Sequence, residues 1–278
     1  GPDAERMLEH LSVAKIGGNT PEDKIIYTNF LDDDGGVHAD LTISRLSVDR
    51  YRVVTGGADG NQDWLTMRNY RDDMGLEAEI NIRTHDMATL GLWGPTAKDA
   101  LGHFIDPNEI SIENFPFVAA KHLKLNLSGG KSIDVWAARI SYVGESGWEI
   151  YLNNDDEEGL ALYDSLLEVG VVPVGIETYA NSRRLEKSFR LQGADLLSEY
   201  NACESAVQRP KVKEADFHGK AAHLAHREEE PSAILCTMTL DKLDVSGEGN
   251  RYPVGISPII DPDTGEVPID NKGRRSYT

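Results

Sequence analysis

Two periods of apolar residues run through the chain, one typical of helices and one typical of strands. Met7, Leu8 and Leu11 recur on one helical face, whereas apolar and polar residues alternate from Leu41 to Arg45 as in a strand. The predicted helices cover 3–11, 61–73, 157–169 and 178–187, with a capped helix start over 96–101 and a further helix from 216 to about 227. The predicted strands cover 24–30, 41–45, 51–55, 90–95, 117–127, 133–143, 148–153 and 233–240.

Short turns connect several of these strands. An acidic glycine turn over 32–36 joins the first two, and a second glycine turn over 128–130 joins a later pair. Because hairpin links outnumber crossover helices, the pattern predicts a mixed α+β fold with mostly antiparallel sheets. The best candidate for a domain boundary lies at 228–232, where a run of glutamates is followed by a proline. We therefore expect a core over 1–227, made of two subdomains, and the start of a β-rich C-terminal domain over 228–278.

Composition and charge narrow the possible functions. The 278 residues are 40% hydrophobic and carry a formal net charge of −19, so the average surface repels nucleic-acid phosphates. No apolar run approaches the roughly 18 residues needed to cross a bilayer, which argues against a membrane protein. Two distant cysteines, Cys203 and Cys236, give no disulfide framework. A reducing compartment fits best, namely the cytoplasm or, in a eukaryote, the mitochondrial matrix.

Several short motifs suggest chemistry that their spacing does not support. The segment 129–132 imitates the end of a phosphate loop, but that motif needs a glycine where Leu125 stands. The segment 144–147 lacks the spacing of a serine-hydrolase elbow, and the acidic runs miss the spacing of a calcium loop. His223 and His226 lie one helical turn apart, but without a third ligand we interpret them as a solvated helix face. We predict no metal site.

Five segments, in chain order, carry the functional signal. They are Gly1-Pro2-Asp3-Ala4; Tyr27-Thr28 followed by Gly35-Gly36-Val37-His38-Ala39-Asp40-Leu41; Leu90-Gly91-Leu92-Trp93-Gly94-Pro95; Ile140-Ser141-Tyr142-Val143-Gly144-Glu145-Ser146-Gly147-Trp148-Glu149-Ile150; and Ser182-Arg183-Arg184-Leu185-Glu186-Lys187-Ser188-Phe189-Arg190 with Asp216-Phe217-His218-Gly219-Lys220 downstream. Together they resemble the folate-binding aminomethyltransferase family, which includes the glycine cleavage T-protein and the C-terminal halves of dimethylglycine and sarcosine dehydrogenases. Each segment alone is a weak signal, but their shared order covers nearly the whole chain.

The resemblance implies a fold and a cofactor. Family members consist of three domains in a cloverleaf around a central folate channel, so we expect a multi-domain cloverleaf that binds tetrahydrofolate. In the family the Gly-Pro-Asp-Ala segment follows a further N-terminal portion that helps to line the channel, and we expect this chain to lack it. No dinucleotide fingerprint is present, so any FAD would bind on a separate or missing domain.

The resemblance also implies roles for individual residues. Asp40 matches the family carboxylate that steers protons during one-carbon transfer; without the family context it would be a hairpin aspartate. Glu149 matches the residue that binds the aminopyrimidine edge of folate, where a carboxylate accepts two N–H bonds, with a strand-face charge as the alternative. Tyr142 matches a tyrosine near the pterin, and core packing explains it equally well. Tyr27 and Val54 are further predicted folate contacts.

A basic segment stands out in this acidic protein. Arg183, Arg184, Lys187 and Arg190 lie within eight positions, and Arg183 and Lys187 share one helix face. One interpretation is that the segment, with Arg184 as a folate-binding residue, attracts the glutamate tail of folate. The alternative is that these side chains form salt bridges with Glu186 and its neighbours.

Two departures from the T-protein branch bear on the reaction. The T-protein arginine for the folate carboxylate corresponds to Ala180, and a T-protein asparagine corresponds to Gly56. Both resemble the N-methyl amine branch of the family. We therefore expect tetrahydrofolate-dependent capture of a methyl or methylene unit from a small amine such as dimethylglycine or sarcosine, with a flavin dehydrogenase domain or subunit as partner. T-protein-like aminomethyl transfer and a non-catalytic folate-binding module are the alternatives.

Overall fold

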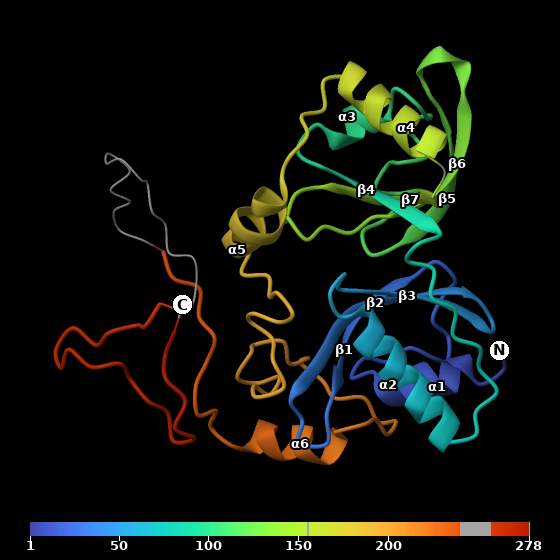
Figure 1. Cartoon of the computed structure of the whole chain (residues 1–278). Helices are drawn as coiled ribbons and strands as arrows, with labels where there is room; N and C mark the ends of the chain where they lie inside the picture. Colours follow the sequence, from blue (N-terminus) through green and yellow to red (C-terminus); the bar gives the residue numbers. More distant parts are fainter. Residues whose placement is uncertain (155, 240–256, 278) are drawn as a thin grey trace.

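A computed structural model of the chain describes residues 1–154, 156–239 and 257–277. Two β-sheets lie one above the other at its centre (Figure 1), and each has helices on the face turned away from the other sheet. The predicted mixed α+β class with antiparallel sheets is confirmed, since every strand pair in both sheets is antiparallel.

The first sheet is a three-stranded meander built from the N-terminal part of the chain. It contains β1 (Ile25–Leu31), β2 (Val37–Ser47) and β3 (Arg50–Thr55), in the order β1-β2-β3. Along the first half of β2, buried and partly buried residues alternate, because successive side chains point to opposite faces of a sheet. The predicted hairpin and the strand after it are therefore confirmed, each with small shifts at its ends.

Two helices cover the outer face of this sheet. They are α1 (Ala4–Leu11) and α2 (Gly60–Asp73), and both lie close to their predicted positions. Their apolar faces pack on the buried side of β1 and β2, which removes those side chains from water. The resulting core consists of Met7, Leu8, Leu11, Ala14, Ile16, Phe30, Ala39, Leu41, Ile43, Met67 and Leu76.

The second sheet has four strands in the order β4-β7-β6-β5. They are β4 (Met87–Trp93), β5 (Ala120–Asn126), β6 (Ser132–Ala138) and β7 (Gly147–Asn153). A short turn, η1 (Ser128–Gly130), links β5 and β6 as predicted. Two helices, α3 (Ala97–Leu101) and α4 (Asp156–Glu168), lie above this sheet in Figure 1. The core between the sheet and these helices includes Leu101, Phe115, Leu125, Ile133, Trp148, Ile150, Leu152 and Leu162.

The inner faces of the two sheets meet in a smaller apolar cluster, which we call the sheet junction. Its buried members are Ile25, Ala120, Trp136, Ala138 and Tyr151, and Leu46, Val54, Met87, Val118 and Ile140 pack against them. Backbone bonds also join the sheets, because Ile25 N donates to the carbonyl oxygen of Val118 at 2.9 Å. The junction therefore sets the inner face of β1–β3 against the inner face of β4–β7.

The predicted helix over 178–187 is confirmed with slightly shifted ends, but most of it has π-helical in place of α-helical hydrogen bonding. Residues Glu177–Arg183 form the π-helical turn η2, and Arg184–Glu186 form α5, which lies beside the space between the two sheets (Figure 1). An irregular segment follows and reaches α6 (Lys220–Glu228). This segment docks on the β1–β2 turn, where Gly36 bridges Asn201 and Val37 N donates to the Tyr200 carbonyl at 3.0 Å.

The predicted strand near 233–240 is wrong over its described part. Residues 233–239 contain no strand, and residue 240 lies outside the described residues. Leu235 N donates to the carbonyl of Glu204, a loop residue, so this segment follows a loop and does not join a sheet. Over 257–277 the described β contacts are two isolated bridges, Pro258 with Tyr277 and Ile269 with Arg275. The division at residue 227 stays a prediction.

Candidate active site at the sheet junction

Asp40 lies on the inner face of the first sheet. Its neighbours Ala39 and Leu41 are buried in the outer core, so strand alternation turns Asp40 the other way. Asn29, its partner on β1, donates from Nδ2 to Asp40 Oδ1 at 3.0 Å. The structure therefore directs this carboxylate towards the second sheet, as its predicted role requires.

The surroundings of Asp40 disfavour its charged form. Burial raises the pKa of Asp40 to about 6, and the nearby carboxylates of Asp59 and Asp63 raise it as well. Hydrogen bonding by Tyr27 and Asn29 lowers the pKa but does not cancel these effects. No cation forms an ion pair with Asp40 among the residues that the structure describes. Asp40 can therefore take up and release a proton close to neutral pH.

Glu149 lies on the inner face of the second sheet. Its neighbours Trp148 and Ile150 are buried in the opposite core, and Glu149 pairs with Gly91 of β4 and Ala138 of β6. Burial raises the pKa of Glu149, while a short hydrogen bond from the Tyr151 hydroxyl to Oε2 opposes that rise. Within the described ranges the other oxygen, Oε1, has no hydrogen-bond donor in this structure.

The two carboxylates therefore face the same junction from opposite sheets. Arg52, on the inner face of β3, stacks over the Trp136 ring with its guanidinium carbon 4.1 Å from the ring centroid, and lies 5.7 Å from that of Tyr151. This contact joins β3 of the first sheet to β6 and β7 of the second. Arg52 was not predicted from the sequence, since its role depends on how two separate sheets pack.

Four aromatic rings close one side of the junction, and we call them the aromatic wall: Trp93, Tyr142, Tyr179 and Phe189. Tyr179 lies 5.5 Å from Trp93 and 5.3 Å from Tyr142, and Tyr142 stacks on Phe189 at 6.2 Å between ring centroids. The negative charge of Asp40 contributes to raising the pKa of Tyr142, and that of Glu149 contributes to raising the pKa of Tyr179. The wall therefore extends from one carboxylate to the other.

Tyr142 has both a packing role and a place beside the candidate site. Its hydroxyl donates to the Arg190 carbonyl at 2.8 Å, which explains why the side chain is fixed. Burial raises the pKa of Tyr142 to about 12, so the hydroxyl keeps its proton at neutral pH. The packing interpretation of Tyr142 is supported by these contacts, and its contact with folate stays a prediction.

Val54 and Tyr27 lie on the same inner face as Asp40. Val54 pairs with Thr42 and packs in the sheet junction, whereas Tyr27 is 42% exposed. Burial of its hydroxyl and the charge of Asp40 both raise the pKa of Tyr27. Tyr27 and Val54 therefore share a sheet face with Asp40, and Glu149 is linked to Tyr142 through Tyr179. The folate contacts of these five predicted site residues, Asp40, Glu149, Tyr142, Val54 and Tyr27, stay predictions.

Arg184 is the exception, because its donors are used within the chain. Its guanidinium forms an ion pair with Asp195 and donates to the carbonyl oxygens of Ala180 at 2.6 Å and Phe189 at 3.1 Å. Arg183 pairs with Glu145 at 2.5 Å and with Glu186 at 2.8 Å. The salt-bridge interpretation therefore describes both side chains, and Arg184 holds the segment beside the junction in place.

The residues around the junction suit a polar ligand. Buried polar atoms without a hydrogen-bond partner among the described residues include Arg52 Nη1, Ser141 Oγ and Gln192 Oε1. Gln192 also donates from Nε2 to the carbonyl of His38, two positions before Asp40. Leaving such atoms unpaired costs roughly 1–3 kcal/mol each, so a ligand that supplies donors and acceptors would stabilise this region. Tetrahydrofolate, whose pterin carries both, fits these residues.

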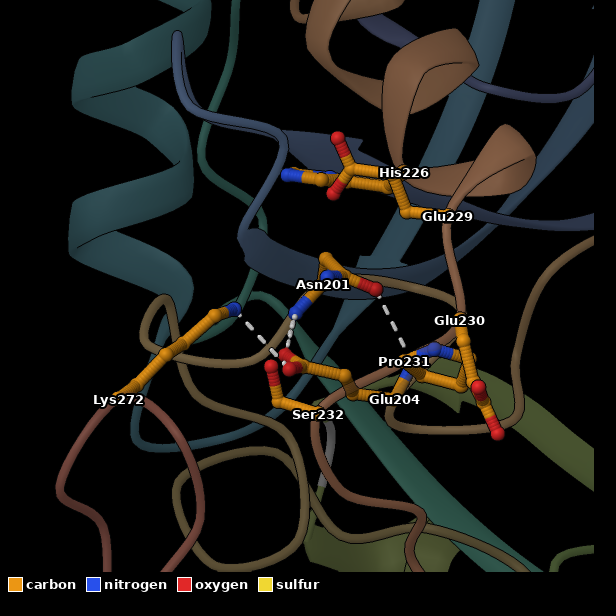
Figure 2. A pocket seen from close by; sticks show the side chains of 8 residues that line it. All are labelled: Asn201, Glu204, His226, Glu229, Glu230, Pro231, Ser232 and Lys272. Atoms are coloured by element: carbon orange, nitrogen blue, oxygen red, sulfur yellow. Dashed lines mark hydrogen bonds and ion pairs between the residues drawn. The ribbon is translucent and has the colours of Figure 1, made fainter.

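Two hollows lie elsewhere on the described surface. One, of about 80 Å³, is lined by polar residues around Glu204 and Lys272, as Figure 2 shows. The other, of about 300 Å³, is open to solvent beside Lys98 and His103. Neither includes Asp40 or Glu149.

One histidine of the α6 pair differs from the predicted solvated helix face, whereas His226 is partly exposed and lines a surface hollow. His223 is 1% exposed and packs edge-on against Phe217, with 6.0 Å between ring centroids. Burial lowers the pKa of His223, which therefore stays neutral within a core. In the part of the chain that the structure describes, no group of three or more His, Cys, Asp or Glu side chains is arranged to hold a metal ion.

Fold and site together define a class of α+β protein in which two sheets present partly buried carboxylates to a shared junction. The family model described as the GCVT N-terminal domain matches residues 1–210, and the chain therefore belongs to the folate-binding aminomethyltransferase family. A crystal structure of the glycine cleavage system aminomethyltransferase T from Bartonella henselae shares the fold. It has a TM-score of 0.69 and 23% identity, covering 99% of this chain and 68% of that one.

Curated relatives include the mitochondrial dimethylglycine dehydrogenases of mammals. The human protein is 33% identical over 260 residues and the rat protein 33% identical over 262 residues. Each alignment covers 90% of this chain but only 28% and 29% of those proteins, so the chain spans little more than a quarter of their length. Within the described ranges, no helix is both long enough and apolar enough to cross a membrane.

Proposed function

We propose that this chain binds tetrahydrofolate at the sheet junction and captures a methyl or methylene unit from an N-methylated amine, as in the demethylation of dimethylglycine or sarcosine. One observation carries the proposal: Asp40 and Glu149 are largely buried, face one junction and have no cation to neutralise them among the described residues. Burying an unpaired charge is costly, and such sites are retained where they serve chemistry or binding.

Asp40 is the proposed acid–base residue. With a pKa of about 6 it is mostly ionised at neutral pH, yet it can hold a proton without a large cost. In its ionised form the carboxylate also stabilises positive charge that develops on a donor nitrogen. Tyr27 and Asn29 interact with the carboxyl group and so fix its orientation on the inner face of the sheet.

Glu149 is the proposed recognition residue for the aminopyrimidine edge. Its Oε2 accepts from Tyr151 and Oε1 is left to accept an N–H bond, so a contact through both oxygens requires Oε2 to accept a second hydrogen bond with its other lone pair. Val54 supplies apolar contact from the first sheet, and Tyr142 lies at the aromatic wall. In this proposal the junction is part of the central folate channel of a cloverleaf.

The one-carbon chemistry divides between this chain and others. Bound tetrahydrofolate would supply the N5 and N10 nitrogens that accept the one-carbon unit. Oxidation of the amine to the iminium level removes two electrons, and we assign that step to a flavin dehydrogenase domain or subunit. This chain then holds the acceptor beside Asp40 and excludes water from the junction. In this proposal the chain meets tetrahydrofolate and the flavin dehydrogenase in the cytoplasm or in the mitochondrial matrix.

T-protein-like aminomethyl transfer is the second candidate. Its asparagine would stand at Gly56, where an added Cβ would lie 2.5 Å from Asp59 Oδ2. An asparagine there would require Asp59 to move, and Asp59 is one of the carboxylates that raise the pKa of Asp40. A rotation of the Asp59 side chain would relieve this contact, so it is the glycine at position 56, in place of the T-protein asparagine, that favours the N-methyl amine reaction. A non-catalytic folate-binding module is the third candidate.

Calorimetric titration with tetrahydrofolate under anaerobic conditions tests the proposal. We expect binding in the micromolar range, and we expect Glu149→Gln to weaken it roughly tenfold or more, because a charge-assisted pair of bonds is lost. Glu168→Gln is the matched control, since Glu168 is exposed on α4. No binding by the wild-type chain at high micromolar tetrahydrofolate would disprove the proposal.

The donor is identified by a second experiment. The chain and tetrahydrofolate are incubated with dimethylglycine or sarcosine plus a flavin dehydrogenase, or with an aminomethylated lipoyl protein. Methylenetetrahydrofolate formed only in the first mixture supports the N-methyl amine reaction. Product formed only in the second supports T-protein-like transfer, and folate binding without product in either mixture supports the binding module.

A further inference from the structure

Tyr179 combines a constrained backbone position with a hydroxyl that has no hydrogen-bond partner among the described residues. It lies in the π-helical turn Glu177–Arg183, a rare conformation that often occurs at functional sites. Two ion pairs hold this turn, Arg183 with Glu145 and Arg184 with Asp195. The first connects it to the loop that carries Tyr142, so the position of Tyr179 relative to Tyr142 is fixed.

The neighbours of Tyr179 are fixed in turn. Trp93 Nε1 donates to the carbonyl of Ile140 at 2.8 Å, and the Trp93 ring lies over Gly91 so closely that any side chain at residue 91 would overlap it. Gly91 pairs with Glu149 across β4 and β7. The Trp93 ring therefore lies beside Glu149, and Tyr179 stacks on it with 26° between the ring planes.

The Tyr179 hydroxyl is left available for a ligand. No hydrogen bond from it to any described residue exists in this structure, whereas the Tyr142 and Tyr151 hydroxyls both donate to protein acceptors. Burial raises the pKa of Tyr179, and the charge of Glu149 raises it further, so the hydroxyl remains a donor. The hydroxyl is not among the fully buried unpaired atoms, so it can be reached from outside, and a ligand beside it can accept its proton.

We propose that Tyr179 is a ligand-binding residue of the aromatic wall: its ring packs against the planar heterocycle held by Glu149, and its hydroxyl donates a hydrogen bond to it. This inference rests on the proposed function, because the ligand is the reduced pterin of tetrahydrofolate. It adds a contact from a segment in which the resemblance implied only Arg184 as a folate-binding residue.

The test compares Tyr179→Ala and Tyr179→Phe with the wild-type chain by calorimetric titration with tetrahydrofolate. Loss of the ring is expected to raise Kd about tenfold, and loss of the hydroxyl alone about threefold. Tyr163, 38% exposed on α4, provides matched controls: Tyr163→Ala and Tyr163→Phe are expected to change Kd less than about twofold. The unfolding midpoint of each variant is measured in parallel.

A second readout separates binding from a purely structural role. Tetrahydrofolate should change the fluorescence of Trp93, seen as the difference between the wild-type chain and Trp93→Phe, and Tyr179→Phe should shift that titration by the same threefold. If both Tyr179 variants bind as tightly as the wild-type chain, or lose stability without losing affinity, the inference is overturned and the folate site stands. If the wild-type chain itself does not bind, both proposals fail.

Discussion

Two regions of this protein bury carboxylates, and they do so with opposite consequences. At the sheet junction, burial leaves Asp40 and Glu149 with raised pKa values. In the loop at Asn201–Glu204, which lines the hollow in Figure 2, Glu204 is 2% exposed and forms a bidentate ion pair with Arg274, with Nη2–Oε1 at 2.6 Å and Nη1–Oε2 at 3.2 Å.

Neutralisation explains the difference between the regions. Burial alone would raise the pKa of Glu204, but Arg274, Lys272 and the Asn201 backbone outweigh it and hold the pKa below its usual value. Arg274 is itself fixed by Asp270 at 2.7 Å and by stacking over Tyr200. Glu204 thus attaches the segment 257–277 to the loop, whereas Asp40 and Glu149 are left for a ligand. Burial of a carboxylate indicates function only where no partner compensates for it.

Asp40→Asn should produce the largest effect. Removing the acid–base group is expected to lower the rate of one-carbon transfer by about a hundredfold to ten-thousandfold, while Kd for tetrahydrofolate changes little. Steady-state formation of methylenetetrahydrofolate measures the first quantity and calorimetry the second. Unchanged turnover would show that Asp40 is not catalytic and that its carboxylate, like that of Glu204, has a structural role.

Arg274→Gln should reduce stability more than activity per folded molecule. The substitution leaves Glu204 buried without its main partner, which costs about 3 kcal/mol in the free energy of unfolding. Urea unfolding measures this cost. Arg275→Gln is the control, because Arg275 is exposed and should change stability by less than about 0.5 kcal/mol. Equal unfolding midpoints for the two variants would show that Glu204 needs no compensation.

The pH dependence of stability should have opposite signs in the two regions. The folded pKa of Asp40 lies above its unfolded value, so ionisation destabilises the fold as pH rises through about 6. Asp40→Asn should therefore be more stable than the wild-type chain at pH 7.5, by about 1–3 kcal/mol, with the difference shrinking towards about pH 4. The lowered pKa of Glu204 has the reverse effect, since its contribution is present above its unfolded pKa and is lost on acidification.

Urea unfolding of the wild-type chain, Asp40→Asn and Arg274→Gln at several pH values checks both signs. The Arg274→Gln variant should lose less stability than the wild-type chain on acidification, because its Glu204 no longer has a strongly lowered pKa. A wild-type chain and Asp40→Asn that differ equally at every pH would contradict the assignment of the raised pKa to Asp40.

Much of the fold could be predicted because strand alternation and turn residues act locally. The glycine turns at 32–36 and 128–130 set two hairpins, and alternation on β2 and β7 decides which face carries Asp40 and Glu149. The family resemblance then selected those two carboxylates from many others. Their convergence required the packing of two sheets, which the resemblance implied but periodicity did not.

The parts that were missed depend on contacts between distant segments. Tyr179 lies in a segment whose pattern predicts a regular helix, and its place in the aromatic wall depends on the π-helical turn. Arg274 and Glu204 are 70 positions apart, so no local pattern pairs them. His223 has a helical spacing typical of a surface, yet the docking of α6 against Phe217 buries it.

The contact between Gly36 and the loop at residue 198 has a consequence for the position of Asp40. A Cβ at residue 36 would overlap the carbonyl oxygen of Ser198, so a larger residue would act as a wedge between the hairpin and the loop. It would push the Tyr200 carbonyl away from Val37 N and displace the start of the strand that carries the carboxylate. The absence of a side chain at residue 36 thus lets the hairpin and the loop approach closely, and this close approach helps to position the strand that carries Asp40.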